Sequence, residues 1–407
     1  MKLLLLTQYY PPEIGAPQNR LHELAVRLKA KGIDVEVLTA LPNYPQMEIF
    51  EDYKNGQKRV EEIDGIKVNR AWIYVSQKRG ILSRLLNYFS FVFSSYWLGR
   101  KLGNFDFIMV ESPPLFLGWS AMRLSKKLKA KLIFNVSDLW PESAEKLNIV
   151  NNRTLLNLAY RLEEKCYKNA TLVTGQTMGI VKDINRRFPN VKTHWLPNGV
   201  DINFYEPEKI ENSNFRTRNG FMDSDILFFY GGIIGHAQGL EVILETAKEI
   251  QHRTDIHFIL QGAGPVKEEL VLIKEQHQLN QVHFLPPVSK KEMPFVLKSV
   301  DVALVPLRKL TLFEGAIPSK IFEALAMELP LILAVDGEAR QHFVENAEAG
   351  IFVEPENVAE LSKAVIELAD NPNKRKTLGE NGRKYVIENF NRDKIAKSFF
   401  DSLYGII

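Results

Sequence analysis

Short apolar runs alternate with amphipathic stretches along almost the whole chain. The run KLLLL at residues 2–6 is followed by RLHELAVRLKAKG, in which apolar residues recur at helical spacing. After residue 200 the pattern starts again with the apolar run ILFFYGG and the helical pattern GLEVILETAKEIQ. Uninterrupted apolar strands that alternate with helices are typical of parallel sheets with helices on both faces. The sequence therefore predicts an α/β protein with two Rossmann-like, doubly wound domains.

The restart places the domain boundary near LPNGVDINFYEPEK, and 407 residues are too many for one core. We expect a first domain over residues 1–200 and a second over residues 201–389. In doubly wound sheets, ligands bind at the carboxyl edges of the strands. The predicted binding site is therefore the cleft between the two domains.

The charge is distributed unevenly along the chain. Residues 1–200 contain 29 Lys and Arg against 18 Asp and Glu, a net charge of +11, and the rest of the chain carries −8, which gives the total of +3. A basic first half favours an anionic partner, either a membrane surface or a phosphate-bearing substrate. The absence of a nucleic-acid motif argues against nucleic acid. The single cysteine, Cys166, excludes an internal disulfide and fits a reducing compartment.

The segment AIPSKIFEALAMELP, residues 316–330, predicts an amphipathic helix. Ser319 is a favourable N-cap residue, and a lysine follows it in the first turn, where the helix dipole disfavours a cation. A bound phosphate would explain Lys320, because free backbone N–H groups and an ammonium group together suit an anion. Glu323 lies on the same face, three residues further on.

Two glycine-containing turns follow apolar strands. In the first, Gly15 could bring backbone N–H groups close to a ligand, although an ordinary βα loop is the simpler interpretation. In the second, YGGIIG, the glycines at 231, 232 and 235 suit the approach of a phosphate. The spacing is neither GxGxxG nor GxxxxGK[ST], so neither a dinucleotide fold nor a P-loop is indicated. No cluster has zinc-ligand spacing, and no GxSxG element is present.

Charged residues also follow two other apolar runs. Asp138 stands at the end of KLIFNV, where a carboxylate beside Trp140 suits sugar recognition, or where it caps the following turn. Arg308 and Glu314 precede the helix at 316–330, in a loop that could equally be a charged surface loop. Residues 79–101 are strongly apolar and aromatic with basic ends. They fit a helix in a membrane interface or a buried helix, and they are too polar and too short for a transmembrane span.

Three segments give the chain a resemblance to glycosyltransferase family 4. These are LPNGVD at 196–201, QGAGP at 261–265 and PSKIFEALAMELPLIL from residue 318. The resemblance covers essentially the whole chain, and together the segments are specific. It implies the GT-B fold with two facing Rossmann-like domains, a retaining reaction, a nucleotide-sugar donor and a final helix, residues 390–407, that packs on the first domain. The details are most similar to the bacterial surface-polysaccharide branch that includes N-acetyl-L-fucosaminyl transferases.

The resemblance also assigns roles to residues. Ser319 and Lys320 would face the diphosphate, Glu323 would hold the ribose hydroxyls, and Gly15 and Gly262 match glycines that approach the donor. The family's paired glutamates are separated by seven residues, whereas Glu314 and Glu323 have eight between them.

The family's Arg and Lys after the second domain's first strand are absent from this chain. His236 and Gln238 stand there instead, so Arg308 or Lys320 is expected to balance the diphosphate charge. The candidate catalytic residues are Asp138, Glu314 and Lys320. The candidate donor-binding residues are Gly15, Gly232, Gly235, Gly262, Arg308, Ser319, Lys320 and Glu323.

The sequence thus predicts a retaining hexosyl- or N-acetylhexosaminyl-type glycosyltransferase. We expect it to use a nucleotide-diphosphate sugar, in particular a UDP-sugar such as UDP-N-acetyl-fucosamine. The acceptor would be a lipid-linked precursor of O-antigen, capsule or exopolysaccharide. We expect no cofactor, no essential metal, and a location on the cytoplasmic face of the inner membrane with contact through residues 79–101. The alternatives are a sugar-nucleotide 2-epimerase of the same fold and a non-catalytic protein that binds sugar nucleotides or membranes.

Overall fold

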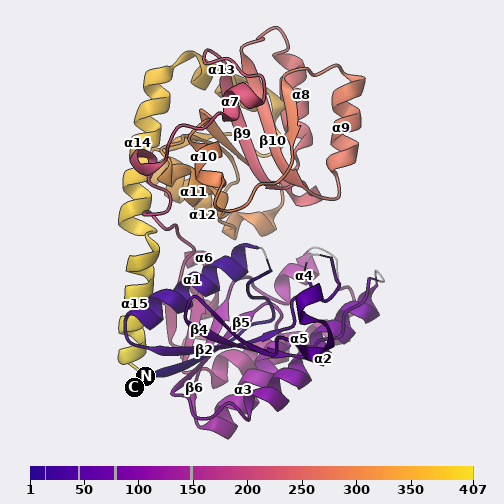
Figure 1. The fold of residues 1–407 in the computed structure, drawn as a ribbon, viewed down its shortest axis with the longest axis vertical. Helices are drawn as coiled ribbons and strands as arrows, with labels where there is room; N and C mark the ends of the chain where they lie inside the picture. Colours follow the sequence, from indigo (N-terminus) through magenta and orange to yellow (C-terminus); the bar gives the residue numbers. More distant parts are fainter. Residues whose placement is uncertain (14, 45, 78–79, 147–149, 407) are drawn as a thin grey trace. The chain divides into compact units, whose positions relative to one another are not determined.

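The computed structural model describes residues 1–13, 15–44, 46–77, 80–146 and 150–406 (Figure 1). The chain divides into two compact units. Unit 1 comprises Met1–Asn198 and Arg392–Ile407, and unit 2 comprises Gly199–Asn391. The sequence prediction places the first boundary two residues later, between residues 200 and 201.

Unit 1 is built on a sheet with the strand order β3-β4-β2-β1-β5-β6-β7-β8 in the described residues. Only the edge strand β3 runs antiparallel to its neighbour, and the other pairs are parallel. The strands are β1 Lys2–Leu6, β2 Asp34–Ala40, β3 Val60–Ile63, β4 Ile66–Ala71, β5 Phe107–Ser112, β6 Lys131–Val136, β7 Leu172–Gly175 and β8 Thr193–Trp195. The β3–β4 hairpin is a part of the sheet that the alternating pattern did not indicate.

Helices cover both faces of this sheet because its strands are apolar on both sides. In β1, Leu3 and Leu5 belong to the core under α1 and α15, while Leu4 and Leu6 belong to the core under α2, α3 and α5. The helices are α1 Ala16–Ala30, α2 Ile81–Gly99, α3 Leu117–Leu128, α4 Glu142–Lys146, α5 Arg153–Asn169, α6 Met178–Arg187 and α15 Arg392–Tyr404, with a 3-10 segment at Glu51–Gly56.

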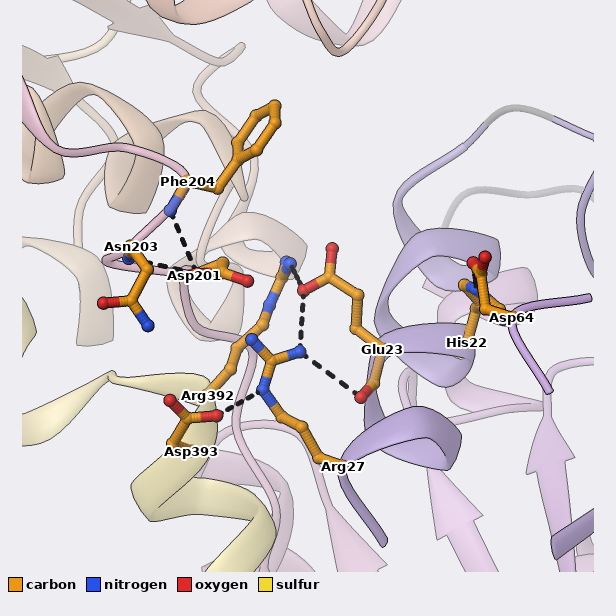
Figure 2. A network of polar contacts seen from close by, with 9 residues as sticks. All are labelled: His22, Glu23, Arg27, Asp64, Asp201, Asn203, Phe204, Arg392 and Asp393. Carbon is orange, nitrogen blue, oxygen red and sulfur yellow. Dashed lines mark hydrogen bonds and ion pairs between the residues drawn. The ribbon is translucent and has the colours of Figure 1, made fainter. Parts of the chain in front are cut away.

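The last helix, α15, is fastened to α1 within unit 1 (Figures 1 and 2). Arg27 Nε donates to Asp393 Oδ1 at 2.7 Å, and Arg27 Nη1 donates to Glu23 Oε2 at 3.3 Å. Arg392 donates to the same glutamate. Glu23, Arg27 and Arg392 are largely buried, so these ion pairs are shielded from solvent. They hold α15 against the face of the sheet that α1 covers.

Unit 2 has a wholly parallel sheet with the order β11-β10-β9-β12-β13-β14 in the described residues. The strands are β9 Ile226–Ile233, β10 Ile256–Ala263, β11 Val282–Leu285, β12 Val302–Pro306, β13 Leu331–Ala334 and β14 Gly350–Phe352. The helices are α7 Phe215–Arg218, α8 Glu241–Glu249, α9 Lys267–Gln276, α10 Met293–Leu297, α11 Lys320–Ala326, α12 Glu338–Arg340, α13 Val358–Asp370 and α14 Pro372–Asn389, with 3-10 segments at Pro207–Lys209, His236–Gln238 and Thr311–Gly315 and a π-helix at Gln341–Asn346. The apolar run ILFFYGG, with which the pattern restarts, forms β9.

The apolar segment predicted at 79–101 forms helix α2, and residue 79 lies outside the described residues. One face of α2 is buried through Asn87, Phe91, Val92 and Ser95. The opposite face exposes large apolar side chains. These are Leu86, Phe89, Phe93 and Trp97. The sequence left a buried helix and a helix in a membrane interface as alternatives. One face of α2 is buried, and contact of the exposed face with a membrane stays a prediction. No helix in the described parts of the chain combines the length and apolar content needed to cross a membrane.

Candidate functional site

Unit 2 contains a pocket between the sheet and two short helices. Strands β9 and β12 form its floor, and α10 and α11 supply its walls. Its empty volume is about 330 Å³, counting the space open to solvent. The lining residues are Phe229, Gly231, Met293, Leu297, Ala303, Leu304, Val305, Lys320, Glu323 and Ala324. Two predicted site residues, Lys320 and Glu323, therefore come together in one mostly apolar pocket.

The Lys320 ammonium is the main cationic group of this pocket. Its Nζ lies 3.6 Å from the centroid of the Tyr230 ring, which places the cation over the aromatic face. Part of the lysine side chain is accessible to solvent, but protein surrounds the ammonium. Burial lowers the pKa of Lys320 to about 7, and the nearby Glu323 carboxylate opposes that shift. An incoming anion would restore the charged form.

The helix that carries Lys320 begins at that residue, as the sequence predicted, but the Ser319 side chain does not cap it. Ser319 has helical backbone angles, φ −61° and ψ −27°, and makes no side-chain cap hydrogen bond. A capping serine needs an extended backbone so that its hydroxyl can reach amides further on, so the N-cap prediction was wrong. The Ile321 and Phe322 amides donate to the Pro318 and Ser319 carbonyls. The phosphate interpretation therefore rests on the Lys320 ammonium and not on the helix amides.

Glycines at the carboxyl ends of the paired strands β9 and β10 lie beside Lys320. Gly262 has a φ of +158°, and a Cβ on it would lie 1.8 Å from the Gly232 carbonyl oxygen. Gly232 has a φ of +142°, and a Cβ there would lie 3.1 Å from Lys320 Nζ. Only glycine allows these backbones and the ammonium to approach so closely. The predicted Gly232 and Gly262 thus meet at the end of β9 and β10, and Gly235 precedes the 3-10 turn at His236–Gln238.

Arg308 is engaged by protein groups in this structure. Its Nε donates to the His236 carbonyl at 2.6 Å, and its Nη2 and Nη1 donate to Glu241 at 2.7 Å and Glu356 at 3.0 Å. These contacts join the loop after β12 to the loop after β9. The predicted contact between Arg308 and the donor diphosphate stays a prediction, and it would require the guanidinium to exchange these partners.

The two candidate glutamates have different environments. Glu323 lines the pocket with Lys320, whereas Glu314 lies in the exposed 3-10 segment Thr311–Gly315 and is not among the pocket residues. A Cβ on Gly337, whose φ is +82°, would lie 2.0 Å from the Glu314 carbonyl oxygen. Gly337 therefore fixes the backbone path at Glu314. The proposed contact of Glu314 with the transferred sugar stays a prediction.

The first-half candidates lie in unit 1. Gly15 is the residue before α1 and has an extended backbone, φ 175° and ψ 163°. Asp138 follows β6 and accepts a hydrogen bond of 2.6 Å from the Ser143 hydroxyl. Burial raises the pKa of Asp138, and the Ser143 bond partly offsets the increase. The alternative in which Asp138 braces the following turn has this bond in its favour, and the sugar-binding role stays a prediction.

Sequence reasoning missed a buried polar network at the same edge of unit 1. Arg20 Nη2 donates to Glu111 Oε1 at 2.7 Å and to Ser137 Oγ at 2.8 Å, and both charged side chains are less than a tenth exposed. Asn135 and Ser137 also donate to Glu111. A carboxylate at the end of the apolar run FDFIMV was the available signal. The network fixes the backbone immediately before Asp138.

The pocket of unit 2 provides an ammonium group, a carboxylate and an apolar wall. An ammonium suits a phosphate oxygen, and a carboxylate accepts two hydroxyl hydrogen bonds, as a vicinal diol presents them. In the described residues no three His, Cys, Asp or Glu side chains are grouped so that they could hold a metal ion. Tyr230, Met293 and Leu297 were not expected from the sequence, because nothing local marks an aromatic or apolar residue as part of a site.

Both halves of the chain match known families. Residues 211–385 match the family described as "Glycosyl transferases group 1". Residues 15–199 match the "Glycosyl transferase 4-like domain". Together the two matches span most of the chain.

Individual relatives agree with these families. The chain is 25% identical, over all of both chains, to the Escherichia coli (strain K12) protein described as "Putative colanic acid biosynthesis glycosyl transferase WcaI". Its fold is similar to sucrose-phosphate synthase of Thermosynechococcus elongatus, with a TM-score of 0.76 and 18% identity over the full length of both chains. It is also similar to Anabaena HepE in complex with UDP-glucose, with a TM-score of 0.72 and 17% identity over both full lengths. The GT-B fold predicted from the sequence is confirmed.

Proposed function

Since the chain belongs to the glycosyltransferases of the group 1 and 4-like type, we propose that it transfers a sugar from a nucleotide diphosphate to a polysaccharide precursor. The observation that carries this proposal is the Lys320 ammonium beside Glu323 and the glycine turn in the unit 2 pocket. We propose a UDP-sugar as donor, with a hexose or N-acetylhexosamine such as N-acetyl-fucose. The UDP-glucose complex of the similarly folded HepE supports this choice of base.

In the proposed donor complex, Lys320 binds the diphosphate and Glu323 accepts the hydroxyls of the ribose. Ser319 has a hydroxyl that is not used as a helix cap, and it lies next to Lys320 in the chain. The proposed acceptor is a lipid-linked saccharide in the synthesis of O-antigen, capsule or exopolysaccharide. The similarity to WcaI, which is described as a putative glycosyl transferase of colanic acid biosynthesis, supports the exopolysaccharide case.

The proposed reaction retains the configuration of the anomeric carbon. The bond from that carbon to the diphosphate oxygen breaks, and a bond to the acceptor oxygen forms on the same face. The acceptor's hydroxyl proton passes to the leaving diphosphate. The protein contributes positioning and charge stabilisation, for which Lys320 is the main candidate. Because a cation of the protein balances the diphosphate, we propose that no metal is required.

Thermal unfolding with UDP, GDP, ADP, dTDP and CMP tests the donor assignment. A nucleotide that binds only the native state stabilises it by about 2.7 kcal/mol at one hundred times its Kd. We expect the largest increase in Tm with UDP, unchanged by EDTA. If another nucleotide gives the largest increase, the donor base is different. If EDTA abolishes the increase and Mg²⁺ restores it, the metal-free proposal is wrong.

Glu323→Gln tests the ribose contact, since glutamine keeps the size of the side chain and removes its charge. We expect the increase in Tm with UDP to fall sharply. The variant Glu354→Gln changes an exposed carboxylate that pairs with Lys309 and serves as the control. Normal UDP binding by Glu323→Gln would contradict the assignment. Nucleotide release that requires an acceptor separates transfer from epimerisation, which needs none, and from binding without catalysis.

We also propose that the exposed face of α2 contacts the cytoplasmic surface of the inner membrane. Phe93 and Trp97 are 51% and 54% exposed, and neighbouring Trp72 is 53% exposed. Arg100 lies 3.8 Å from the Trp97 ring centroid. Exposed aromatic rings with cations beside them suit anionic lipid headgroups, and the charge of residues 1–200 has the matching sign.

Sedimentation with vesicles of phosphatidylglycerol and phosphatidylethanolamine tests this contact. We expect the double variant Phe93→Ser/Trp97→Ser to lose most of its vesicle binding with an unchanged Tm, because both side chains are half exposed. Leu272→Ser removes a 65% exposed leucine from α9 in unit 2 and is the matched control. Equal binding by the two variants and the unsubstituted protein would show that another surface, or none, meets the membrane.

A further inference from the structure

The two predicted phosphate-binding cations of unit 2 have very different partners. Arg308 is neutralised by the Glu241 and Glu356 carboxylates. Lys320 instead lies over the ring of Tyr230, and in the described residues it forms no ion pair within 4 Å. An aromatic face attracts an ammonium without cancelling its charge, so the N–H groups directed away from the ring stay available to an oxyanion. The partner of Lys320 therefore suits a cation that must receive a ligand.

Tyr230 is held rigidly at this position. It is fully buried, and its hydroxyl donates to the Ile233 carbonyl oxygen at 2.5 Å. That bond ties the ring to the backbone of the glycine turn. Gly232, in the same turn, faces the ammonium so closely that a Cβ there would lie 3.1 Å from Nζ. The Tyr230 ring and the Gly232 backbone, which both lie against the Lys320 ammonium, thus belong to the same end of β9.

We propose that Tyr230 is a positioning residue of the donor site, whose ring holds the Lys320 ammonium at the glycine turn so that a nucleoside diphosphate can bind there. This inference rests on the proposed function and extends it to a residue that the family resemblance did not assign. Tyr230 acts through Lys320 and need not touch the donor.

The buried position of the Lys320 ammonium should make its protonation change when a diphosphate binds. The titratable groups that face it are Tyr230 on β9 and Glu323 on its own helix, and the other pocket residues are apolar or glycine. Burial lowers the pKa of Lys320 to about 7, so at pH 8 the free protein holds this side chain mainly neutral. A diphosphate favours the charged form, so its binding at pH 8 takes up a proton.

Isothermal titration of the full chain with UDP at pH 8, in buffers of different ionisation enthalpy, measures that proton. UDP itself is fully ionised at this pH, since a phosphate loses its second proton near pH 6. We expect uptake approaching one proton per UDP, and an affinity that falls about tenfold per pH unit above 7. Lys320→Arg stays charged at every pH and should bind UDP without proton uptake. Proton uptake that the unsubstituted protein shows and this variant lacks identifies Lys320 as the group that meets the diphosphate.

Variants of Tyr230 then test the ring itself. Tyr230→Phe keeps the ring and loses the bond to Ile233, and we expect UDP affinity within about twofold of the original, because the ring is the partner of Lys320. Tyr230→Leu removes the ring, and we expect UDP affinity about tenfold weaker at pH 6.5, where Lys320 is charged. Equal affinity of a folded Tyr230→Leu protein would refute the positioning role. If Tyr230→Leu fails to fold, Tyr230→Met, which also lacks a ring, takes its place, and UDP affinity equal to the original there refutes the positioning role as well.

The positioning role of Tyr230 and the glycosyltransferase function are contradicted by different results. UDP that binds a folded Tyr230→Leu protein as tightly as the original overturns the inference and leaves the glycosyltransferase proposal standing. Failure of UDP, GDP, ADP and inorganic pyrophosphate to bind at any pH overturns both, since no anion would then reach Lys320.

Discussion

Arg308 offers the sharpest test of structural reasoning against sequence reasoning. The sequence predicts it as one of two cations that could balance the donor diphosphate, whereas the structure shows its guanidinium joining two loops of unit 2. Arg308→Met removes the charge and keeps most of the apolar stem. It deletes a hydrogen bond to the His236 carbonyl and two partly exposed ion pairs, to Glu241 and Glu356.

The size of the effect follows from these contacts. A charged donor to a carbonyl contributes about 1.5 kcal/mol, and an exposed ion pair about 0.2–1 kcal/mol. We therefore expect unit 2 to lose about 2 kcal/mol of stability in Arg308→Met, allowing for non-additivity. UDP affinity should change little, because Lys320 supplies the charge for the diphosphate. The neighbouring Lys309→Met removes one exposed ion pair to Glu354 and should change the stability of unit 2 much less.

The assay must report on unit 2. All tryptophans of the chain lie in unit 1, at positions 72, 97, 119, 140 and 195, so their fluorescence follows that unit. Native-state hydrogen exchange of residues 226–239 follows β9 and its turn directly, and 2 kcal/mol corresponds to roughly thirtyfold faster exchange. If Arg308→Met exchanges normally but no longer binds UDP, the guanidinium is a donor ligand and the structural argument fails.

The remaining predictions concern buried charge and close backbone packing. Arg20→Met should destabilise unit 1 by about 3 kcal/mol or more, because it leaves the Glu111 carboxylate buried without its cation. Urea unfolding followed by tryptophan fluorescence measures this loss of stability. Adding Glu111→Gln to the variant should recover part of the loss. Gly262→Ala should destabilise unit 2 by about 3 kcal/mol and abolish UDP binding, since the new methyl collides with the Gly232 carbonyl. Gly220→Ala is the control, because Gly220 has a φ of +78° and open space around it. It should cost only about 1 kcal/mol of stability and leave UDP binding intact. Similar losses of stability in both glycine variants would mean that the backbone at Gly262 adjusts to the new methyl group.

Parts of the site were visible in the sequence because they depend on local chemistry. Lys320 drew attention as a cation in the first turn of a helix, and Glu323 followed from helical spacing. The glycines at 232 and 262 stood directly after apolar runs. The structure brings Lys320, Glu323 and the Gly232 turn together because parallel strands end at one edge of the sheet.

Other parts could not be derived from local chemistry. The N-cap role given to Ser319 was wrong because its backbone has helical angles and its side chain makes no capping hydrogen bond. Those angles depend on the path of the loop from β12 to α11, which the capping preference of serine does not determine. The pairing of Arg20 with Glu111 links residues 91 positions apart, and the covering of Arg308 links it to positions 48 and 67 residues away. No spacing rule connects such partners.

The amino-acid sequence was enough to predict the class of fold, because uninterrupted apolar strands that alternate with amphipathic helices leave parallel sheets covered on both faces as the simple solution. It also determined the chemistry available at the strand ends. Only the tertiary structure decided which cations have partners: Arg308 meets two carboxylates, whereas Lys320 meets an aromatic ring. That difference depends on distances between segments far apart in the chain, and it decides which of two similar charges is available to a phosphate.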